Sequence, residues 1–151
     1  MTVPRPLIVT LQYPSVDWAL SGIFIHRHVR SLVEAGVALR VVSPCPSLPA
    51  VFHFSARWQR NADQRKEKIY DGGDVDRLPF CHLPLPFFRH LSFVALGLRL
   101  ARYVRSGLSG FQPNLIHVHR LYPDGLMGLV AARRLHLPLL CSARGSDVHS
   151  L

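Results

Sequence analysis

Residues 7–43, LIVTLQYPSVDWALSGIFIHRHVRSLVEAGVALRVVS, decide the fold of this chain. The apolar run Leu7–Leu11 is typical of a buried strand, and a loop follows it. From Ile23 the apolar residues recur at helical spacing, and a second β-branched run, Leu39–Ser43, ends at Pro44. Strand, loop, helix and strand in this order predict a parallel βαβ unit. The apolar stripe of the helix comprises Ile25, Val29, Leu32 and Val33.

The later part of the chain continues this alternation. The spacing predicts a helix over Leu91–Ser106, a strand over Leu115–His119, a helix over Asp124–Leu135 and a last strand over Pro138–Ser142. Alternating strands and helices indicate the α/β class, with a Rossmann-like open parallel sheet and helices on both faces. The apolar stripe of the first of these helices comprises Phe93, Leu96, Leu100 and Val104.

The rhythm breaks between the second strand and the helix that begins at Leu91. We expect an excursion over the surface at residues 45–67, which are rich in proline at the start and in charge at the end. Lys68–Tyr70 and Val75–Leu78 flank the sequence DGGD at 71–74. This pattern predicts a small hairpin with a glycine turn.

The composition indicates one folded domain. The chain has 151 residues, of which 48% are hydrophobic and 18% charged, and this excludes a disordered chain. Three cysteines would leave one unpaired, so we expect free thiols in a reducing cytosol. We find no apolar window of about 18 residues and no secretory signal. We therefore expect a cytoplasmic protein without a transmembrane helix.

The formal net charge of +9 indicates an anionic partner. Nucleic acid, a phosphorylated ligand and an acidic membrane surface would all fit, and an arginine-rich surface without a partner is the alternative. Arg99, Arg102 and Arg105 fall on one polar side of the predicted helix at 91–106. The basic residues are not clustered with aromatic residues and no recognition motif occurs, so we expect no nucleic acid.

Candidate site residues follow three of the predicted strands, at the edge of an open α/β sheet where ligands bind. Gly22 opens the first helix, where free amide groups and the helix dipole favour a phosphate. The alternative is an ordinary glycine turn in which Ser21 is the N-cap.

His117 and His119 alternate along a strand, so both rings face the same side. A metal pair at this spacing would need a third ligand, such as Asp124, and the sequence contains no zinc motif. We therefore expect no metal. His117 lies deeper in the strand and suits a packed, hydrogen-bonded role, whereas His119 is the better candidate for contact with a ligand.

The loop after the last strand, Ser142–Asp147, combines a cation, a glycine, hydroxyls and a carboxylate. Arg144 is suited to a bidentate grip on phosphate, and Gly145 allows a tight turn. Ser146 adds a hydroxyl. Asp147 would either orient a sugar hydroxyl or serve as a turn or N-cap residue.

Five segments in order resemble the N-terminal half of a GT-B fold glycosyltransferase of the retaining family 4 type. They lie across nearly the whole chain, and their order and spacing carry more weight than any one of them. The segments are Gly22–Phe24, Pro113–His119, Tyr122–Gly125, Ala132–Pro138 and Arg144–Asp147.

The resemblance implies two Rossmann-like domains around a cleft, of which the N-terminal one mainly holds the acceptor. It implies that Gly22 lies beside the diphosphate of a nucleotide-sugar donor and that His119 faces the reacting sugar as the catalytic-site histidine. The reaction would transfer the sugar with retention and would need neither metal nor other cofactor. The residues implied to line the acceptor side of the cleft are Tyr122, Asp124, Arg144, Gly145, Ser146 and Asp147.

Residues 1–151 would form only this N-terminal domain, because the family's C-terminal donor-binding domain, with two glutamates separated by seven residues, does not occur in the sequence. We therefore expect little or no transferase activity from the chain alone. The acceptor would be a glycan or a lipid-linked sugar. Family members often work at the inner face of a membrane, and the basic stretch Arg89–Arg105 would suit peripheral docking there. The alternative function is a non-catalytic basic module that binds membranes or phosphate.

Overall fold

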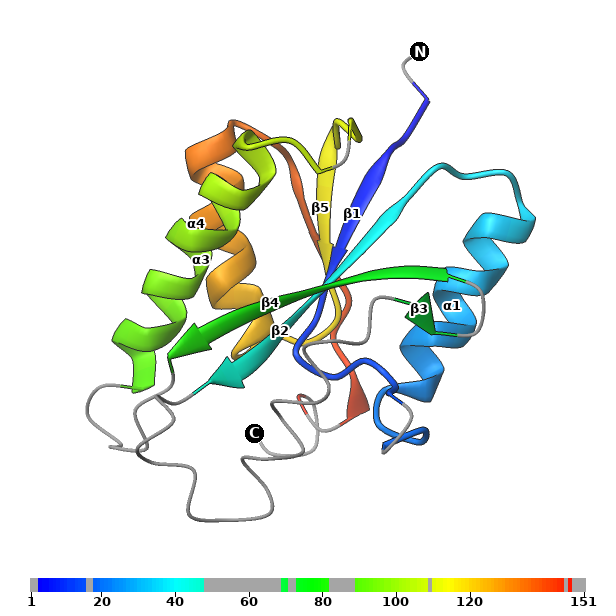
Figure 1. Cartoon of the computed structure of the whole chain (residues 1–151), viewed down its shortest axis with the longest axis horizontal. Helices are drawn as coiled ribbons and strands as arrows, with labels where there is room; N and C mark the ends of the chain where they lie inside the picture. Colours follow the sequence, from blue (N-terminus) through cyan, green and yellow to red (C-terminus); the bar gives the residue numbers. More distant parts are fainter. Residues whose placement is uncertain are drawn as a thin grey trace.

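The computed structural model describes residues 3–15, 18–47, 69–70, 73–81, 89–108, 110–145 and 147. Six strands form one sheet in the order β3-β4-β2-β1-β5-β6 (Figure 1). All neighbouring strands are parallel except β3 and β4, which are antiparallel. The strands are β1 (Pro6–Val9), β2 (Arg40–Ser47), β3 (Ile69–Tyr70), β4 (Gly73–Cys81), β5 (Leu115–Val118) and β6 (Leu139–Cys141).

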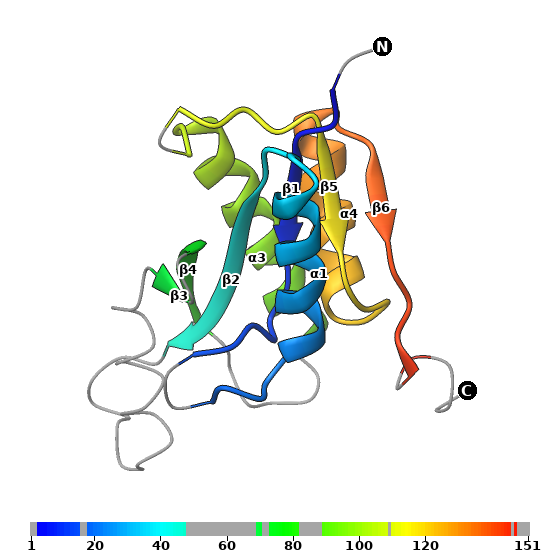
Figure 2. The same ribbon diagram turned by 90° about the vertical axis from the view of Figure 1, so that its right-hand side faces the viewer.

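Helices cover both faces of the sheet, which confirms the predicted Rossmann-like architecture. Helix α1 (Ile23–Glu34) covers one face, and α3 (Arg89–Arg105) and α4 (Asp124–Leu135) cover the other (Figures 1 and 2). Side chains alternate along β1, so Leu7 and Val9 pack in the core under α3 and α4 while Ile8 packs under α1. None of the helices in the described residues is long and apolar enough to cross a membrane.

Two glycines allow α4 to lie close to both of its neighbours. A Cβ atom at Gly97 of α3 would lie 2.6 Å from the carbonyl oxygen of Met127 and 2.7 Å from Cβ of Val130. A Cβ atom at Gly128 of α4 would lie 2.5 Å from Cγ1 of Val118 in β5. Helix α4 therefore packs directly against both α3, its neighbour on the same face, and strand β5.

Two predicted elements differ from the structure at their ends or faces. Strand β2 continues through Pro44 to Ser47, because its pairing with β4 runs on after its pairing with β1 has ended at Val42. A proline is tolerated where a strand is paired on one side only. In α1 the predicted stripe is partly wrong, since Val33 is 55% exposed and His26 is buried instead. The ring of His26 lies 2.9 Å, at Nδ1, from the hydroxyl of Tyr13.

The apolar stripe of α3 and the small hairpin are confirmed. Strands β3 and β4 are the two arms of the hairpin, with Ile69 paired to Asp74 and Tyr70 to Gly73. Strand β4 then extends to Cys81 and pairs with β2, which the sequence pattern did not predict. Most of the predicted excursion at 45–67 lies outside the described residues.

Candidate functional site

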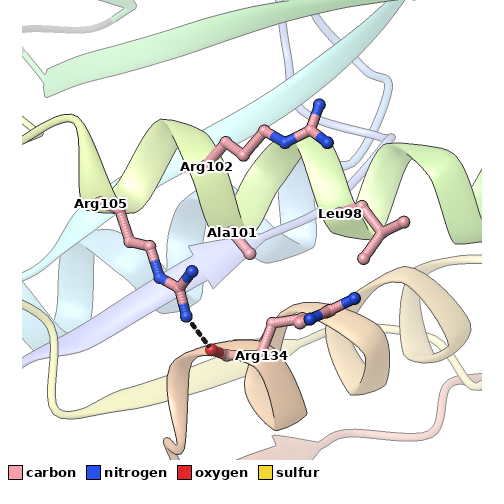
Figure 3. Close-up of a pocket in the computed structure, with 5 residues that line it drawn as sticks. All are labelled: Leu98, Ala101, Arg102, Arg105 and Arg134. Carbon is pink, nitrogen blue, oxygen red and sulfur yellow. Dashed lines mark hydrogen bonds between the residues drawn. The ribbon is translucent and has the colours of Figure 1, made fainter.

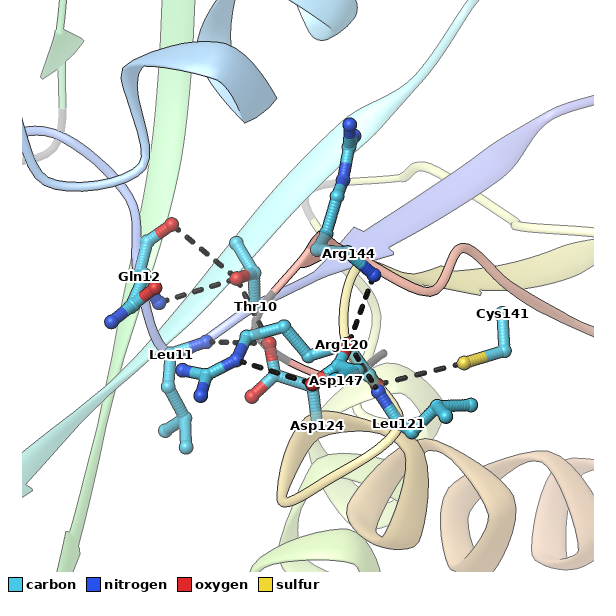
Figure 4. Close-up of polar contacts among 9 residues, drawn as sticks. All are labelled: Thr10, Leu11, Gln12, Arg120, Leu121, Asp124, Cys141, Arg144 and Asp147. Carbon is cyan, nitrogen blue, oxygen red and sulfur yellow. Dashed lines mark hydrogen bonds and ion pairs between the residues drawn. The ribbon is translucent and has the colours of Figure 1, made fainter. Parts of the chain in front are cut away.

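Asp124 joins the end of β1 to the start of α4. Its carboxylate is fully buried, and Oδ2 accepts hydrogen bonds from the Thr10 hydroxyl at 3.0 Å and from the Leu11 amide at 3.3 Å (Figure 4). The position follows from the sequence, because α4 begins directly after the β5 loop, beside the carboxyl end of β1. Asp124, one of the predicted site residues, therefore fixes the loop after β1 from inside the protein.

Burial raises the pKa of Asp124 to about 6, although the bonds from Thr10 and Leu11 and the charge of Arg120 oppose the shift. Its second oxygen, Oδ1, is buried and has no hydrogen-bond partner among the described residues. Ionisation of this buried carboxyl group therefore costs free energy, and a neutral amide at the same position would not carry that cost.

Asp147 connects the loop after β6 to the loop after β5. Its Oδ2 accepts hydrogen bonds from the backbone amides of Leu121 at 3.1 Å and Arg144 at 3.0 Å, and Oδ1 lies 4.0 Å from Nε of Arg120 (Figure 4). The side chain is only 7% exposed. These contacts give Asp147 a turn-forming role, one of the two roles predicted for it, and hold the two loops together.

Three histidines from two elements gather on the face of the sheet under α1. His117 and His119 lie on the same side, as predicted, with ring centroids 4.2 Å apart. His28 of α1 packs edge-on against both rings, at 5.6 Å and 5.2 Å. Nε2 of His117 lies 2.8 Å from the hydroxyl of Ser142 at the end of β6, which agrees with the packed, hydrogen-bonded role predicted for this residue.

His119 is fully buried, and Nη2 of Arg144 lies 2.8 Å from its Nδ1. Burial, together with the neighbouring charges of His117, Arg144 and His28, lowers the pKa of His119 to about 3. The ring is therefore neutral near pH 7. Because a guanidinium only donates, Nδ1 accepts and the ring proton lies on Nε2. That Nε2 has no hydrogen-bond partner among the described residues.

Arg144 links the loop after β6 to the first turn of α1. Its guanidinium lies 4.9 Å from the ring centroid of Phe24, in a cation–π contact, as well as against His119. Gly145, next in the chain, is exposed. Ser146 lies outside the described residues.

Tyr122 does not lie with the group formed by His28, His117 and His119. Its hydroxyl lies 3.2 Å from Nδ1 of His90 and its ring packs edge-on against Phe93, so it belongs to the α3 side of the sheet. The predicted site residues thus divide between two faces, with His119 and Arg144 on the α1 side.

Gly22 is the N-cap of α1 and has φ 70°, a left-handed conformation. A Cβ atom here would lie 2.1 Å from the carbonyl oxygen of Gln12. The Gln12 backbone therefore lies so close that this position requires glycine. The N-cap of α1 is Gly22 and not Ser21, which was the predicted alternative.

Sequence reasoning missed His28 and Phe24 as site residues. They are four residues apart on α1, so they share one face of the helix, and Ile25 and Val29 beside them are buried. This spacing was the available signal for placing His28 near the sheet. The residue that lies beside His117 and His119 is thus His28, and not Asp124, which we named as the third ligand that a metal pair would need.

A comparison with protein-family models identifies one family. The family model described as "Glycosyl transferase 4-like domain" matches residues 21–151. No curated protein matches the chain. Its structure is similar to that of UGT89C1 from Arabidopsis thaliana complexed with UDP, with 12% identity and a TM-score of 0.47, over 90% of this chain and 34% of that one. It is also similar to LpCGTa in complex with UDP, with 20% identity and a TM-score of 0.41, over 93% and 30% of the two chains. The chain thus spans about a third of the length of these structures.

Proposed function

The chain belongs to the glycosyl transferase 4-like domain family, and we propose from this that it is the N-terminal, acceptor-side half of a GT-B glycosyltransferase. With a donor-binding domain it would transfer a sugar, with retention, from a nucleotide-sugar to a glycan or a lipid-linked acceptor. The observation that carries the proposal is the contact between Arg144 and the buried His119 under the first turn of α1. This contact places the charge of Arg144 and the unpartnered Nε2–H donor of His119 at the carboxyl ends of the strands, where such sheets bind ligands.

His119 would hold a hydroxyl of the reacting sugar. Its neutral ring keeps a proton on Nε2, and this buried nitrogen lacks a partner among the described residues. A buried donor without a partner is costly, so a ligand oxygen at this point would be bound favourably. With a pKa of about 3, His119 would act by hydrogen bonding and would not take up a proton near pH 7.

The diphosphate of the donor would lie near Gly22. The N-terminus of α1 carries the positive end of the helix dipole, and Arg144 adds a full charge beside Phe24, in the first turn of the same helix. Both features favour an anion at this edge of the sheet. Asp124 and Asp147 would serve this site by holding the loops in place.

The chain alone would have little or no activity, because the groups that bind the donor on the other wall of the cleft are supplied by the second domain. The test is to join the chain to the C-terminal half of a full-length relative and to measure sugar transfer to lipid-linked and polysaccharide acceptors. Transfer by the joined protein, lost in His119→Ala, would support the proposal. Inactivity of a well-folded joined protein on all these acceptors would count against it.

A second proposal is peripheral contact with an acidic membrane through α3. Arg99, Arg102 and Arg105 are exposed, and Arg102 and Arg105 border a small pocket of about 170 Å³ with Arg134 of α4 (Figure 3). Arg105 donates a hydrogen bond to the Arg134 carbonyl, so part of this charge also caps the end of α4. A basic cluster of this kind attracts anionic lipid headgroups.

Sedimentation with vesicles containing acidic lipid tests this contact. We expect binding that weakens as salt is added and that is reduced in Arg99→Gln/Arg102→Gln. The matched control, Arg27→Gln/Arg30→Gln, removes the same charge from exposed positions on α1. Equal binding by the two double variants would show that only net charge matters, and would exclude a specific role for α3.

A further inference from the structure

We propose that the pocket between the second half of α3 and the last turn of α4 binds a phosphomonoester group. The pocket has a volume of about 170 Å³ (Figure 3). A single water molecule needs only about 10–15 Å³, so a phosphate group has room there. Three of the five lining residues are arginines and none is acidic, which suits an anion. The lining comprises Leu98, Ala101, Arg102, Arg105 and Arg134.

The positive charge around this pocket is not neutralised by its surroundings. None of the 17 residues of α3 is acidic, and the only acidic residue of α4 is Asp124, at the opposite end of that helix. The three arginines of the pocket form no ion pair with any described residue. Arg99 and Arg133 add two further exposed cations on the same helices. An anion that enters the pocket therefore meets positive charge from both helices.

The end of α4 opposes an anion less than its dipole alone would, because its carbonyl groups have partners. The negative end of a helix dipole repels anions through the unsatisfied carbonyls of the last turn. Here Arg105 donates a hydrogen bond to the Arg134 carbonyl, and the Leu137 amide donates one to the Ala132 carbonyl (Figure 3). The first of these contacts also holds the Arg105 guanidinium at the wall of the pocket, which lowers the entropy cost of binding.

A phosphomonoester suits this lining better than a phosphodiester. It has three terminal oxygens and a charge of about −1.5 to −2 at pH 7, whereas a diester has fewer terminal oxygens and less charge. The guanidinium groups of Arg102 and Arg134 form no hydrogen bond with a described residue, so their paired donors are available for phosphate oxygens. Leu98 and Ala101 offer apolar contact to the carbon substituent of the ester.

The pocket is separate from the candidate site. Helix α4 begins at the carboxyl ends of the strands and runs back along the sheet, so Arg134 lies at the opposite edge from His119 and Arg144 (Figure 1). The phosphomonoester could belong to a membrane lipid or to a soluble metabolite. Only the lipid source rests on the proposed contact of α3 with an acidic membrane, and the pocket itself stands without that contact.

Titration of the chain with inorganic phosphate at constant ionic strength tests the pocket. We expect the Nε–H NMR signals of Arg102, Arg105 and Arg134 to shift along one saturable curve. Arg102→Gln/Arg134→Gln should weaken this binding by at least roughly 10-fold, because hydrogen bonds to a charged group are lost. The matched control, Arg99→Gln/Arg133→Gln, removes the same charge from the same two helices but outside the pocket, and should bind as the parent does.

Vesicles of equal negative charge that contain phosphatidic acid or phosphatidylglycerol identify the source of the phosphate. Preference for phosphatidic acid, lost in the pocket variant, would assign the site to a lipid headgroup. Equal binding to both vesicles, with saturable binding of inorganic phosphate, would assign it to a soluble phosphate ester.

Two results would overturn the proposal. One is the absence of saturable phosphate binding by the parent chain, and the other is equal weakening in the two double variants. Vesicle binding without saturable phosphate binding would remove the pocket but leave the membrane contact of α3 in place.

Discussion

Nη2 of Arg144 lies 2.8 Å from Nδ1 of the buried His119. This contact joins the loop after β6 to the end of β5, and the same guanidinium packs on Phe24 of α1. Three parts of the chain therefore meet at one cation. The properties of His119 depend on this cation, because it fixes the ring proton on Nε2 and contributes to the lowered pKa.

His119→Ala should lower kcat/KM in the chain joined to a donor-binding domain, by roughly 10- to 100-fold, as expected for loss of one hydrogen bond worth about 1–3 kcal/mol. Steady-state kinetics measures the loss, and His136→Asn serves as the control because its side chain is exposed at the far end of α4. Unchanged kinetics in His119→Ala would show that this histidine has no role in the reaction.

Asp124→Asn should make stability less dependent on pH. The folded pKa of Asp124, about 6, lies above its unfolded value of 3.8, so the carboxyl stabilises the fold below pH 3.8 and this contribution is lost as pH rises to 6. The loss is up to about 3 kcal/mol for a shift of this size. Urea unfolding of both proteins across this range should show that the variant becomes more stable relative to the parent as pH rises. A constant difference between them would contradict the assigned pKa.

Gly22→Ala should destabilise the fold by more than Gly36→Ala. Both glycines have positive φ, of 70° and 80°, so alanine pays about 1–2 kcal/mol at either position. Only at Gly22 would the new Cβ collide, at 2.1 Å, with the Gln12 carbonyl, whereas at Gly36 nothing lies within 4 Å. Denaturant titration measures both changes in the free energy of unfolding, and equal losses would mean that the contact with Gln12 does not constrain the protein.

Gly97→Ala should destabilise the protein by about 1–3 kcal/mol, because the added methyl group would meet the Met127 carbonyl at 2.6 Å and overpack the α3–α4 contact. The sign is informative, since alanine ordinarily stabilises a helix interior relative to glycine by about 0.5–1 kcal/mol. Ala95→Gly, at an exposed position of α3, measures that intrinsic preference in the same helix. A stabilised Gly97→Ala would show that α3 can move away from α4.

The order of elements could be predicted from the sequence, because period and length distinguish the strands from the helices without reference to other parts of the chain. Leu7–Leu11 and Leu115–His119 needed no partner to be recognised as strands. The length of β2 could not be predicted without its partner strand, because the pairing with β4 extends β2 through Pro44. The burial of His26 in place of Val33 also depends on a contact with Tyr13, which lies in a loop.

The candidate site was predictable in its location but not in its contacts. The rule that ligands lie beyond the carboxyl ends of parallel strands predicts that Gly22, His119 and Arg144 lie at one edge of the sheet. The contact between Arg144 and His119 spans 25 positions, and no local pattern encodes it. His28 was missed because a histidine on a helix is usually solvated, and only the packing of α1 on the sheet brings it to the other two rings.

The way in which Asp147 holds the two loops has a consequence for how such a site can change. Two of its contacts are to the main-chain amides of Leu121 and Arg144, which every residue except proline possesses. The side chain of Leu121 is therefore free to vary while the loops keep their shape, and it is already 52% exposed. The surface beside this loop can therefore change by exchange of an exposed side chain, without a new scaffold having to evolve around it.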